Sequence, residues 1–343
     1  MGYALGRTRN GGKVLRWSTY LTRMKDVEHE GATSMEGERC RLPPMHDGVD
    51  GGFVIAPAKE EWAQEIMDSW GSVSETEALS RALKPSTHSS STSLGNDGVV
   101  PSDSRISPYL RFGILSPRRA FREGKVRKRD LLWREWSRVC YFNVLNPLIN
   151  GSPVVPQMDG CCAIQPSDDD EMSTKFKSWC VGNTGSPIVD AGMKQLWLEG
   201  WMPRSVRLLC AACLVEGLGL DWRSGRDWFS YTLIDYDPAI NEMMWQNAGL
   251  CGVDPFYRGA KWEVVKEEDA EYVETYKNRE LLLPGHLREY AKQVPDPMWV
   301  ERAKERRNVL KRRGVYSAAR RIVNSGIRVA WPGVNINEDL QDG

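Results

Sequence analysis

Residues 234–246 read IDYDPAINEMMWQ, with two aspartates two residues apart, a proline, and an asparagine four residues before a tryptophan. Asp237 directly before Pro238 predicts a helix start, because an aspartate caps free N–H groups and proline fits the first helical position. A helix that begins there places Asn241 and Trp245, four residues apart, on one face. Two interpretations stay open from this stretch alone. Either the aspartate only caps and the tryptophan only packs, or these groups face a ligand.

Helical patterns dominate the chain from residue 107 onwards. Strand signals are scarce, and neither GxGxxG nor GxxxxGKS occurs, which argues against a Rossmann or P-loop site. The sequence therefore predicts an all-α protein. The expected helices are 60–70, 75–83, one that Pro117 opens, 131–145, 187–197, 203–218 and 226–234.

Charge is balanced overall but unevenly distributed. Lys+Arg and Asp+Glu both total 46 of 343 residues, so the net charge does not favour nucleic acid or membrane. Residues 118–138 carry nine basic side chains and 302–328 carry ten, while the last nine residues are acidic. Such basic runs are compatible with nucleic-acid binding and with solvated helix faces.

The eight cysteines form neither a disulfide framework nor a metal-ligand set. Cys210 and Cys213 lie among leucines and are expected to be small core residues. We therefore expect no metal site and a reducing compartment. No apolar run approaches the roughly 20 residues of a membrane helix, which predicts a soluble protein. The first 25 residues hold six basic and no acidic residues, which is compatible with an organelle transit segment and equally with a disordered tail. The expected compartment is intracellular, either the nucleus or an organelle such as the chloroplast or mitochondrion.

Composition divides the chain into three parts. Residues 1–55 are glycine-rich and basic, and are expected to form a poorly ordered extension. Residues 56–295 are expected to form the helical domain, interrupted by the Ser/Gly/Pro-rich stretch 85–104, which predicts a flexible loop. Residues 296–343 predict a basic helical segment and an acidic tail.

Four segments occur in one order along this helical domain. They are SRISPYLRFGILSP (104–117), DLLWREWSR (130–138), NTGSPIVDAGMKQLWLEGWM (183–202) and LGLDWRSGRDWFSYTLIDYDPAINEMMWQ (218–246). Together they resemble the flavin-binding helical domain of the cryptochrome and DNA photolyase family. The resemblance spans roughly residues 60 to 290. It implies FAD held in a U shape inside an all-helical domain, with a surface for a DNA lesion or a signalling partner over the pocket mouth.

The resemblance gives the opening stretch a chemical role. It implies that Asp235 and Asp237 face the flavin, where a carboxylate accepts the ring N3–H or pairs with Arg207 and stays ionised. It implies that Asn241 faces flavin N5, where a neutral amide stabilises a reduced, negatively charged ring. Trp245 then corresponds to the first electron donor.

Trp222 corresponds to the second tryptophan of the family's electron-transfer chain. A third is expected a few residues before the TG motif, where this chain has only Trp179, closer to TG than the family pattern places it. Trp201 and Tyr231 are the substitutes considered for the terminal donor.

Ser104, Ile106 and Ser107 match the loop that holds the FAD diphosphate in the family. The family threonine at the start of this loop is Asp103 here. One carboxylate at about 6 Å, with an effective dielectric constant of about 20, repels one phosphate charge by roughly 3 kcal/mol. Arg204 stands where the family usually has asparagine, and its charge is expected to offset Asp103.

Asp130, Trp133 and Arg134 match residues that contact the DNA lesion in photolyases, and Arg134 is also expected at the cofactor. The fourth such position is Asn247 in place of tryptophan. Loss of one stacking partner costs about 1–3 kcal/mol per base, which predicts weaker lesion binding. The family's α/β antenna domain has no counterpart in these residues, so no antenna chromophore is expected.

Three functional hypotheses follow. The first is an FAD-dependent, light-driven carbon–carbon lyase of the deoxyribodipyrimidine photolyase type, which repairs pyrimidine dimers in DNA. The second is a cryptochrome-like blue-light photoreceptor that signals through a protein partner without repair. The third is a flavin-free helical interaction protein.

Overall fold

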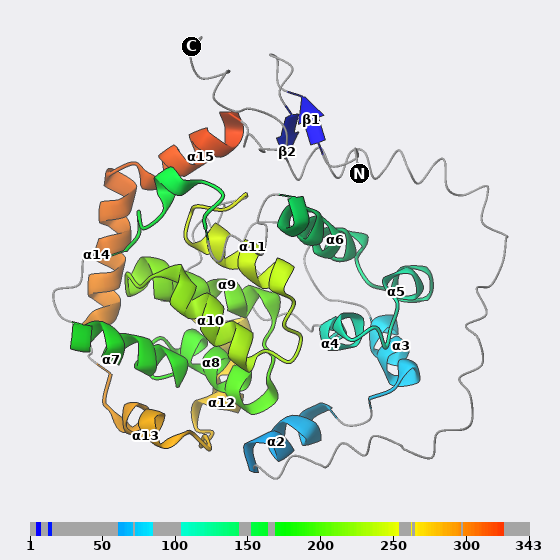
Figure 1. Cartoon of the computed structure of the whole chain (residues 1–343). Helices are drawn as coiled ribbons and strands as arrows, with labels where there is room; N and C mark the ends of the chain where they lie inside the picture. Colours follow the sequence, from blue (N-terminus) through cyan, green and yellow to red (C-terminus); the bar gives the residue numbers. More distant parts are fainter. Residues whose placement is uncertain are drawn as a thin grey trace.

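The computed structural model describes residues 5–7, 13–15, 61–70, 73–84, 104–143, 152–163, 169–253, 262, 265–295 and 298–325. Its architecture is helical (Figure 1), which confirms the predicted fold class. The helices are α2 (Glu61–Trp70), α3 (Glu75–Leu83), α4 (Ser107–Arg111), α5 (Pro117–Glu123), α6 (Lys128–Asn143), η2 (Pro156–Met158), α7 (Asp169–Cys180), α8 (Pro187–Glu199), α9 (Arg204–Ala212), η3 (Cys213–Gly217), α10 (Trp222–Thr232), α11 (Pro238–Ala248), η4 (Glu267–Asp269), α12 (Ala270–Lys277), α13 (Gly285–Lys292), α14 (Trp299–Arg312) and α15 (Val315–Ser325).

The N-terminal part contains a short antiparallel ladder that the sequence analysis missed. Strands β1 (Leu5–Arg7) and β2 (Lys13–Leu15) pair with Leu5 opposite Leu15. The predicted loop at 85–104 lies outside the described residues except for Ser104.

Three helix predictions need correction. Helix α6 begins at Lys128, three residues before the predicted start. Helix α10 begins at Trp222, four residues before the predicted start, because the Asp221 side chain accepts the backbone N–H of Arg223 at 2.8 Å and caps the helix. The segment predicted as one helix from 203 to 218 is α9 followed by η3, a π-helical turn over Cys213–Gly217. Helix α11 begins as predicted, with Asp237 as its cap and Pro238 in its first turn.

The main core lies where α8, α9, α10 and α11 meet. Gly192 lets α8 and α9 approach closely, since an added Cβ would lie 2.4 Å from Val206 Cγ1. Cys210 and Cys213 are fully buried there, as predicted. This core fixes the backbone that carries the opening stretch of sequence.

A second hydrophobic cluster joins α2 to α6. Trp70, Tyr109, Leu115, Leu131 and Trp201 are buried in it. The Trp70 indole donates to the carbonyl oxygen of Glu199 at 2.8 Å, which ties α2 to the end of α8. In Figure 1 the helices α3 to α6 lie on one side of the molecule and α7 to α10 on the other.

Helices α14 and α15 pack onto η3 through a buried carboxylate. Glu216 is 2% exposed and accepts Arg307 Nε at 3.0 Å and the Tyr316 hydroxyl at 2.8 Å. Ala303 and Leu310 of α14 belong to the main core. No helix in the described ranges is long and apolar enough to span a membrane.

Candidate functional site

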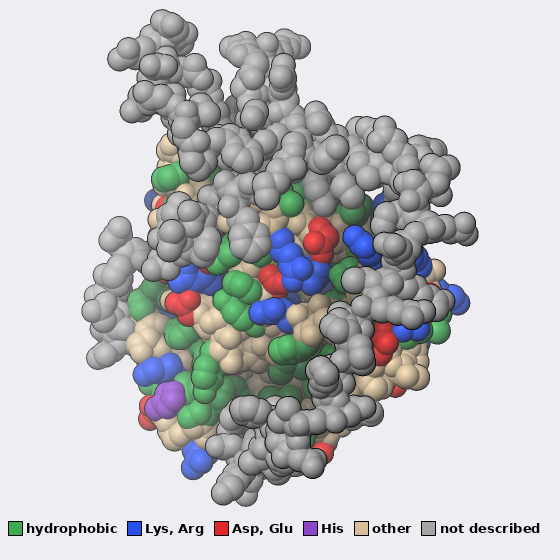
Figure 2. Space-filling model, turned by 45° about the vertical axis from the view of Figure 1, so that its right-hand side comes forward, with side chains coloured by type: hydrophobic (Ala, Val, Ile, Leu, Met, Phe, Trp, Pro, Cys, Tyr) green, Lys and Arg blue, Asp and Glu red, His purple; other side chains and the backbone are tan. Residues whose placement is uncertain are grey.

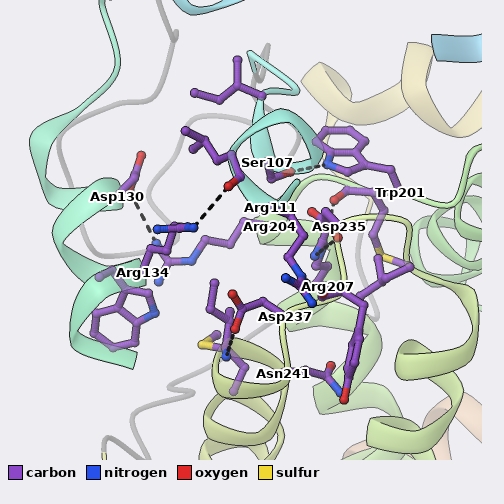
Figure 3. Close-up of a pocket in the computed structure, with 18 of the residues that line it drawn as sticks. Ser107, Arg111, Asp130, Arg134, Trp201, Arg204, Arg207, Asp235, Asp237 and Asn241 are labelled. Carbon is purple, nitrogen blue, oxygen red and sulfur yellow. Dashed lines mark hydrogen bonds and ion pairs between the residues drawn. The ribbon is translucent and has the colours of Figure 1, made fainter. Parts of the chain in front are cut away.

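A pocket opens between α4, α6, α9 and α11 (Figure 3). Its walls bring together segments that are more than a hundred residues apart in the chain. The pocket-lining residues that the sequence analysis selected are Ser104, Ile106, Ser107, Asp130, Trp133, Arg134, Arg204, Arg207, Asp235, Asp237, Asn241 and Trp245. Trp222 does not line it.

Asp235 and Arg207 form a bidentate pair in one wall. Arg207 Nη1 and Nη2 lie 3.1 and 2.8 Å from the two carboxylate oxygens, and Arg207 Nε donates to the Met202 carbonyl oxygen at 2.9 Å. Asp235 is 8% exposed. Of the two roles expected for this carboxylate, the structure shows the pairing with Arg207.

Asp237 serves both α11 and the pocket wall. Its Oδ1 accepts the backbone N–H groups of Ala239 and Ile240 at 3.0 and 3.3 Å. Its Oδ2 accepts Arg138 Nη2 at 2.9 Å. Because both oxygens are occupied, the carboxylate is held in one orientation without any ligand.

The sequence analysis missed Arg138, which does not line the pocket but pairs with the pocket-lining Asp237. Arg138 lies four residues after Arg134 on α6, so the two guanidinium groups share a helix face. The four-residue spacing from Arg134 is the sequence signal that could have identified Arg138. Burial is the main cause that lowers the pKa of the Arg134 guanidinium, and the positive charge of Arg138 lowers it further. Arg111 was also missed; it lines the pocket and donates to the Tyr236 carbonyl oxygen.

Asn241 and Trp245 both face the pocket, as their spacing predicts. The Asn241 amide donates to the Arg226 carbonyl oxygen at 3.0 Å, which orients it. The Trp245 ring packs edge-on against Phe229 and Trp179, with centroids 5.0 and 6.2 Å apart. The main chain of Gly225 lies beneath this ring, since an added Cβ would lie 2.1 Å from Trp245 Cη2.

Trp222 lies on the same helix pair, away from the pocket. An added Cβ at Gly249, one turn after Trp245, would meet Trp222 Cδ1 at 2.5 Å. Each tryptophan thus packs near a glycine of the opposite helix. The Trp222 indole donates to Asp159 at 3.2 Å, and the Arg223 guanidinium lies 4.5 Å from its ring.

The three alternatives for a terminal electron donor occupy different places. Trp179 is fully buried and contacts Trp245. Trp201 lines the pocket and belongs to the second hydrophobic cluster. Tyr231 is 72% exposed and lies against Trp228 with centroids 6.0 Å apart.

The loop before α4 is held by aromatic and ionic contacts. Trp201 Nε1 donates to Ser107 Oγ at 3.0 Å (Figure 3). Arg105 has a left-handed φ of 50°, and its guanidinium lies 4.5 Å from the Trp70 ring and 5.1 Å from the Trp201 ring. Its Nη2 is 2.9 Å from Glu199 Oε2. These contacts hold Ser104 and Ile106, the neighbours of Arg105, in the pocket wall.

Charged and aromatic groups meet at the α6 side of the pocket. The Arg204 guanidinium lies 5.4 Å from the Trp133 ring and 3.8 Å from Asp130 Oδ1. Asp130 also pairs with Arg127 at 2.8 Å. Arg134 donates to the Leu110 carbonyl oxygen at 3.2 Å. Figure 2 shows Lys and Arg gathered with hydrophobic side chains on one face. Asp103, which Arg204 was expected to offset, lies outside the described residues.

Asn247 occupies a different place from the one expected of a lesion contact. It is 2% exposed and does not line the pocket. Its Oδ1 would lie 2.2 Å from a Cβ added at Gly252, so the side chain lies against the turn after α11.

The donor set of the pocket suits a ligand with a flat, partly apolar ring and an anionic part. Five arginines line it against three aspartates. The apolar lining suits a flat ring, and consists of Leu110, Val126, Leu131, Met202, Leu208, Ala211, Phe229, Leu233, Ile240 and Met244. This composition fits a dinucleotide flavin, whose flat ring has an apolar dimethylbenzene edge and a polar pyrimidine edge, and whose diphosphate is negatively charged.

The fold and this pocket define an all-helical flavin-binding domain. Residues 127–304, just over half of the chain, match the family model described as the FAD binding domain of DNA photolyase. The chain belongs to the cryptochrome and DNA photolyase family. The match also confirms FAD as the cofactor expected for this domain.

Individual relatives agree with this assignment. A deoxyribodipyrimidine photo-lyase of Agrobacterium fabrum is 34% identical over 279 residues, which cover 74% of this chain and 54% of the relative. A chloroplastic/mitochondrial cryptochrome DASH of Solanum lycopersicum is 33% identical over 174 residues, covering 46% of this chain and 29% of that protein.

Solved structures show the same fold. A class III photolyase from Agrobacterium tumefaciens matches with a TM-score of 0.52 and 29% identity, over 75% of this chain and 60% of that one. An archaeal photolyase from Sulfolobus tokodaii, crystallised with two FAD molecules, matches with a TM-score of 0.51 and 28% identity, over 70% and 56%. The chain thus spans about half the length of the photo-lyase relatives it matches.

Proposed function

We propose that this protein is an FAD-dependent, light-driven carbon–carbon lyase that splits pyrimidine dimers in DNA. The observation that carries the proposal is that one pocket holds two sets of residues, one suited to a flavin and one suited to a DNA lesion. One part holds Asn241 and Trp245, and another holds Trp133, Arg204 and Asp130. Relatives named deoxyribodipyrimidine photo-lyase support the same reaction class.

The proposed cofactor residues act by binding and orientation. When bound, FAD absorbs light and exchanges single electrons with its surroundings. The Asp235–Arg207 pair and the oriented Asn241 amide present fixed polar groups to the ring. Ser104, Ile106 and Ser107 would hold the diphosphate. Trp245 would be the first donor of an electron to a bound flavin, and Trp222, on the neighbouring helix α10, would donate in turn to Trp245.

The proposed lesion residues receive a dimer flipped out of the duplex. Trp133 offers an indole face, which the guanidinium of Arg204 already contacts. Arg134 and Arg204 offer positive charge to the phosphates that flank the lesion. Stacking on an aromatic ring recovers part of the energy of unstacking the dimer. Ultraviolet-damaged DNA is therefore the proposed partner.

The test begins with the purified protein incubated with FAD and separated from free cofactor. We expect a retained flavin absorption band that bleaches under blue light with a thiol donor, and blue-light-dependent loss of dimers from an irradiated oligothymidylate. Trp133→Ala is expected to lower affinity for this oligonucleotide by about 1–3 kcal/mol, with the flavin band unchanged. Retained flavin with no loss of dimers in any light condition would overturn the lyase proposal.

A blue-light photoreceptor without repair is the second candidate. It is supported by the burial of Asn247 outside the pocket, because the lesion then has fewer stacking partners. Its partner would be a signalling protein. Light-dependent bleaching of the flavin with no change in dimer content would favour this candidate. If the purified protein retains no flavin, the hypothesis of a flavin-free interaction protein is favoured.

An organelle is the compartment that we propose. Two observations support an organelle. Residues 1–25 carry six basic side chains, and a chloroplastic/mitochondrial cryptochrome DASH is among the relatives. A fluorescent fusion that remains outside organelles, with or without residues 1–25, would contradict it.

A further inference from the structure

Two consecutive cysteines lie in a turn that the flavin chemistry does not use. Cys161 and Cys162 follow η2, and their sulfur atoms are 3.8 Å apart with a hydrogen bond between them. Cys161 is half-buried and also contacts the Gly249 carbonyl oxygen at 3.9 Å, whereas Cys162 is 2% exposed. Cys161 is therefore the less buried residue of the pair.

The surroundings make the two thiols unequal. The hydrogen bond from Cys162 lowers the pKa of Cys161, while the same bond and burial raise the pKa of Cys162. The thiolate is the reactive form of cysteine. Cys251, whose charge interacts with Cys161, is buried, and burial raises the pKa of its thiol.

We propose that Cys161 and Cys162 form a peroxide-sensitive dithiol that closes into a disulfide between neighbouring residues. The Cys161 thiolate attacks the O–O bond of hydrogen peroxide and takes one oxygen as a sulfenic acid, and the departing hydroxide is protonated to water. The Cys162 thiol then displaces that oxygen as a second water, and the S–S bond forms. The two thiols together lose two electrons, and one peroxide gains them.

Disulfide closure acts on the contact that holds α14. Neighbouring Cα atoms across a trans peptide lie about 3.8 Å apart, closer than the roughly 4.4–6.8 Å of ordinary disulfides. The backbone of the turn therefore has to move when the bond forms. Arg306 of α14 donates to the Cys162 carbonyl oxygen through Nη2 and to the Glu216 carbonyl oxygen through Nε at 3.0 Å. Oxidation is expected to break the first of these contacts and loosen α14.

The first experiment uses the full chain and needs no flavin. The protein is treated with a small excess of hydrogen peroxide, its free thiols are alkylated, and its peptides are weighed. We expect the peptide that contains both cysteines to lose about 2 Da and both alkylation sites. In Cys162→Ser we expect a sulfenic acid at Cys161 that dimedone traps, and in Cys161→Ser no reaction in this peptide. Cys180→Ser, a buried cysteine elsewhere in the core, is the matched control and keeps the reaction.

The second experiment compares trypsin cleavage in the oxidised and reduced proteins. Loss of one charge-assisted hydrogen bond predicts about tenfold faster cleavage after Arg306 and Arg307 in the oxidised form. Two alkylatable thiols after peroxide treatment, or a bond from Cys161 to a cysteine other than Cys162, would overturn the dithiol site. Equal cleavage of both forms would overturn the release of α14.

Discussion

Asp235 holds Arg207 through both carboxylate oxygens, at distances of 3.1 and 2.8 Å. The aspartate side chain is 4% exposed and the arginine side chain 23%, so water screens the pair little. The pair joins α9 to the loop before α11. It is therefore part of the fold as well as of the pocket wall.

Asp235→Asn is expected to lower the free energy of unfolding of the flavin-free protein by about 2–3 kcal/mol, because Arg207 keeps its charge in a shielded place. Urea denaturation followed by circular dichroism measures this. Asp227→Asn is the matched control: Asp227 pairs with Arg226 at 2.8 Å but is 66% exposed, and little or no change is expected. An equal effect of both substitutions would contradict the prediction.

Arg105 is expected to position the diphosphate loop. Arg105→Asn removes the cation while asparagine tolerates the left-handed backbone. Loss of the contacts to Trp70, Trp201 and Glu199 is expected to cost about 1–2 kcal/mol, which raises the FAD dissociation constant about tenfold. A titration that follows flavin fluorescence gives this constant. A lower melting temperature with unchanged FAD affinity would assign Arg105 to packing alone.

The electron route is tested by two buried tryptophans that differ in position. Trp222→Phe is expected to slow flavin bleaching under blue light, because the step from Trp245 toward the outside of the protein is removed. Trp179→Phe is expected to leave bleaching unchanged, although Trp179 also contacts Trp245. Absorption during continuous illumination measures both rates. The opposite pattern would place the route through Trp179.

Restoring the family tryptophan at residue 247 is expected to lower the stability of the folded protein rather than improve repair. Asn247 is buried against the turn that contains Gly252, so Asn247→Trp overpacks this site and is expected to cost about 1–3 kcal/mol or more. Thermal unfolding measures the loss. A stable variant with tighter binding to dimer-containing DNA would show that the side chain turns toward the pocket.

Local sequence signals predicted the parts of the site that depend on neighbouring residues. The start of α11 follows from Asp237 and Pro238, and the shared orientation of Asn241 and Trp245 follows from their spacing. The pairing of Asp235 with Arg207 followed from the resemblance to a known family, because 28 residues separate the two.

Contacts between distant segments escaped prediction. Arg138 reaches Asp237 across 99 residues, and no periodicity within α6 selects that partner. The burial of Asn247 depends on the turn after α11, which a motif match cannot report. The π-helical turn at η3 looked like ordinary helix because its apolar residues continue the pattern of α9. Such features depend on packing between elements, which sequence periodicity does not encode.

The approach of Gly225 to Trp245 bears on how this pocket can be altered. Main-chain atoms, which have no rotamers, support the indole from the side of α10. Other apolar positions in the lining, such as Leu208, Ala211 and Met244, belong to α9 and α11. A library that varies these three positions therefore leaves unchanged the main-chain support that Gly225 gives to Trp245. Gly225 itself has to remain constant in every member.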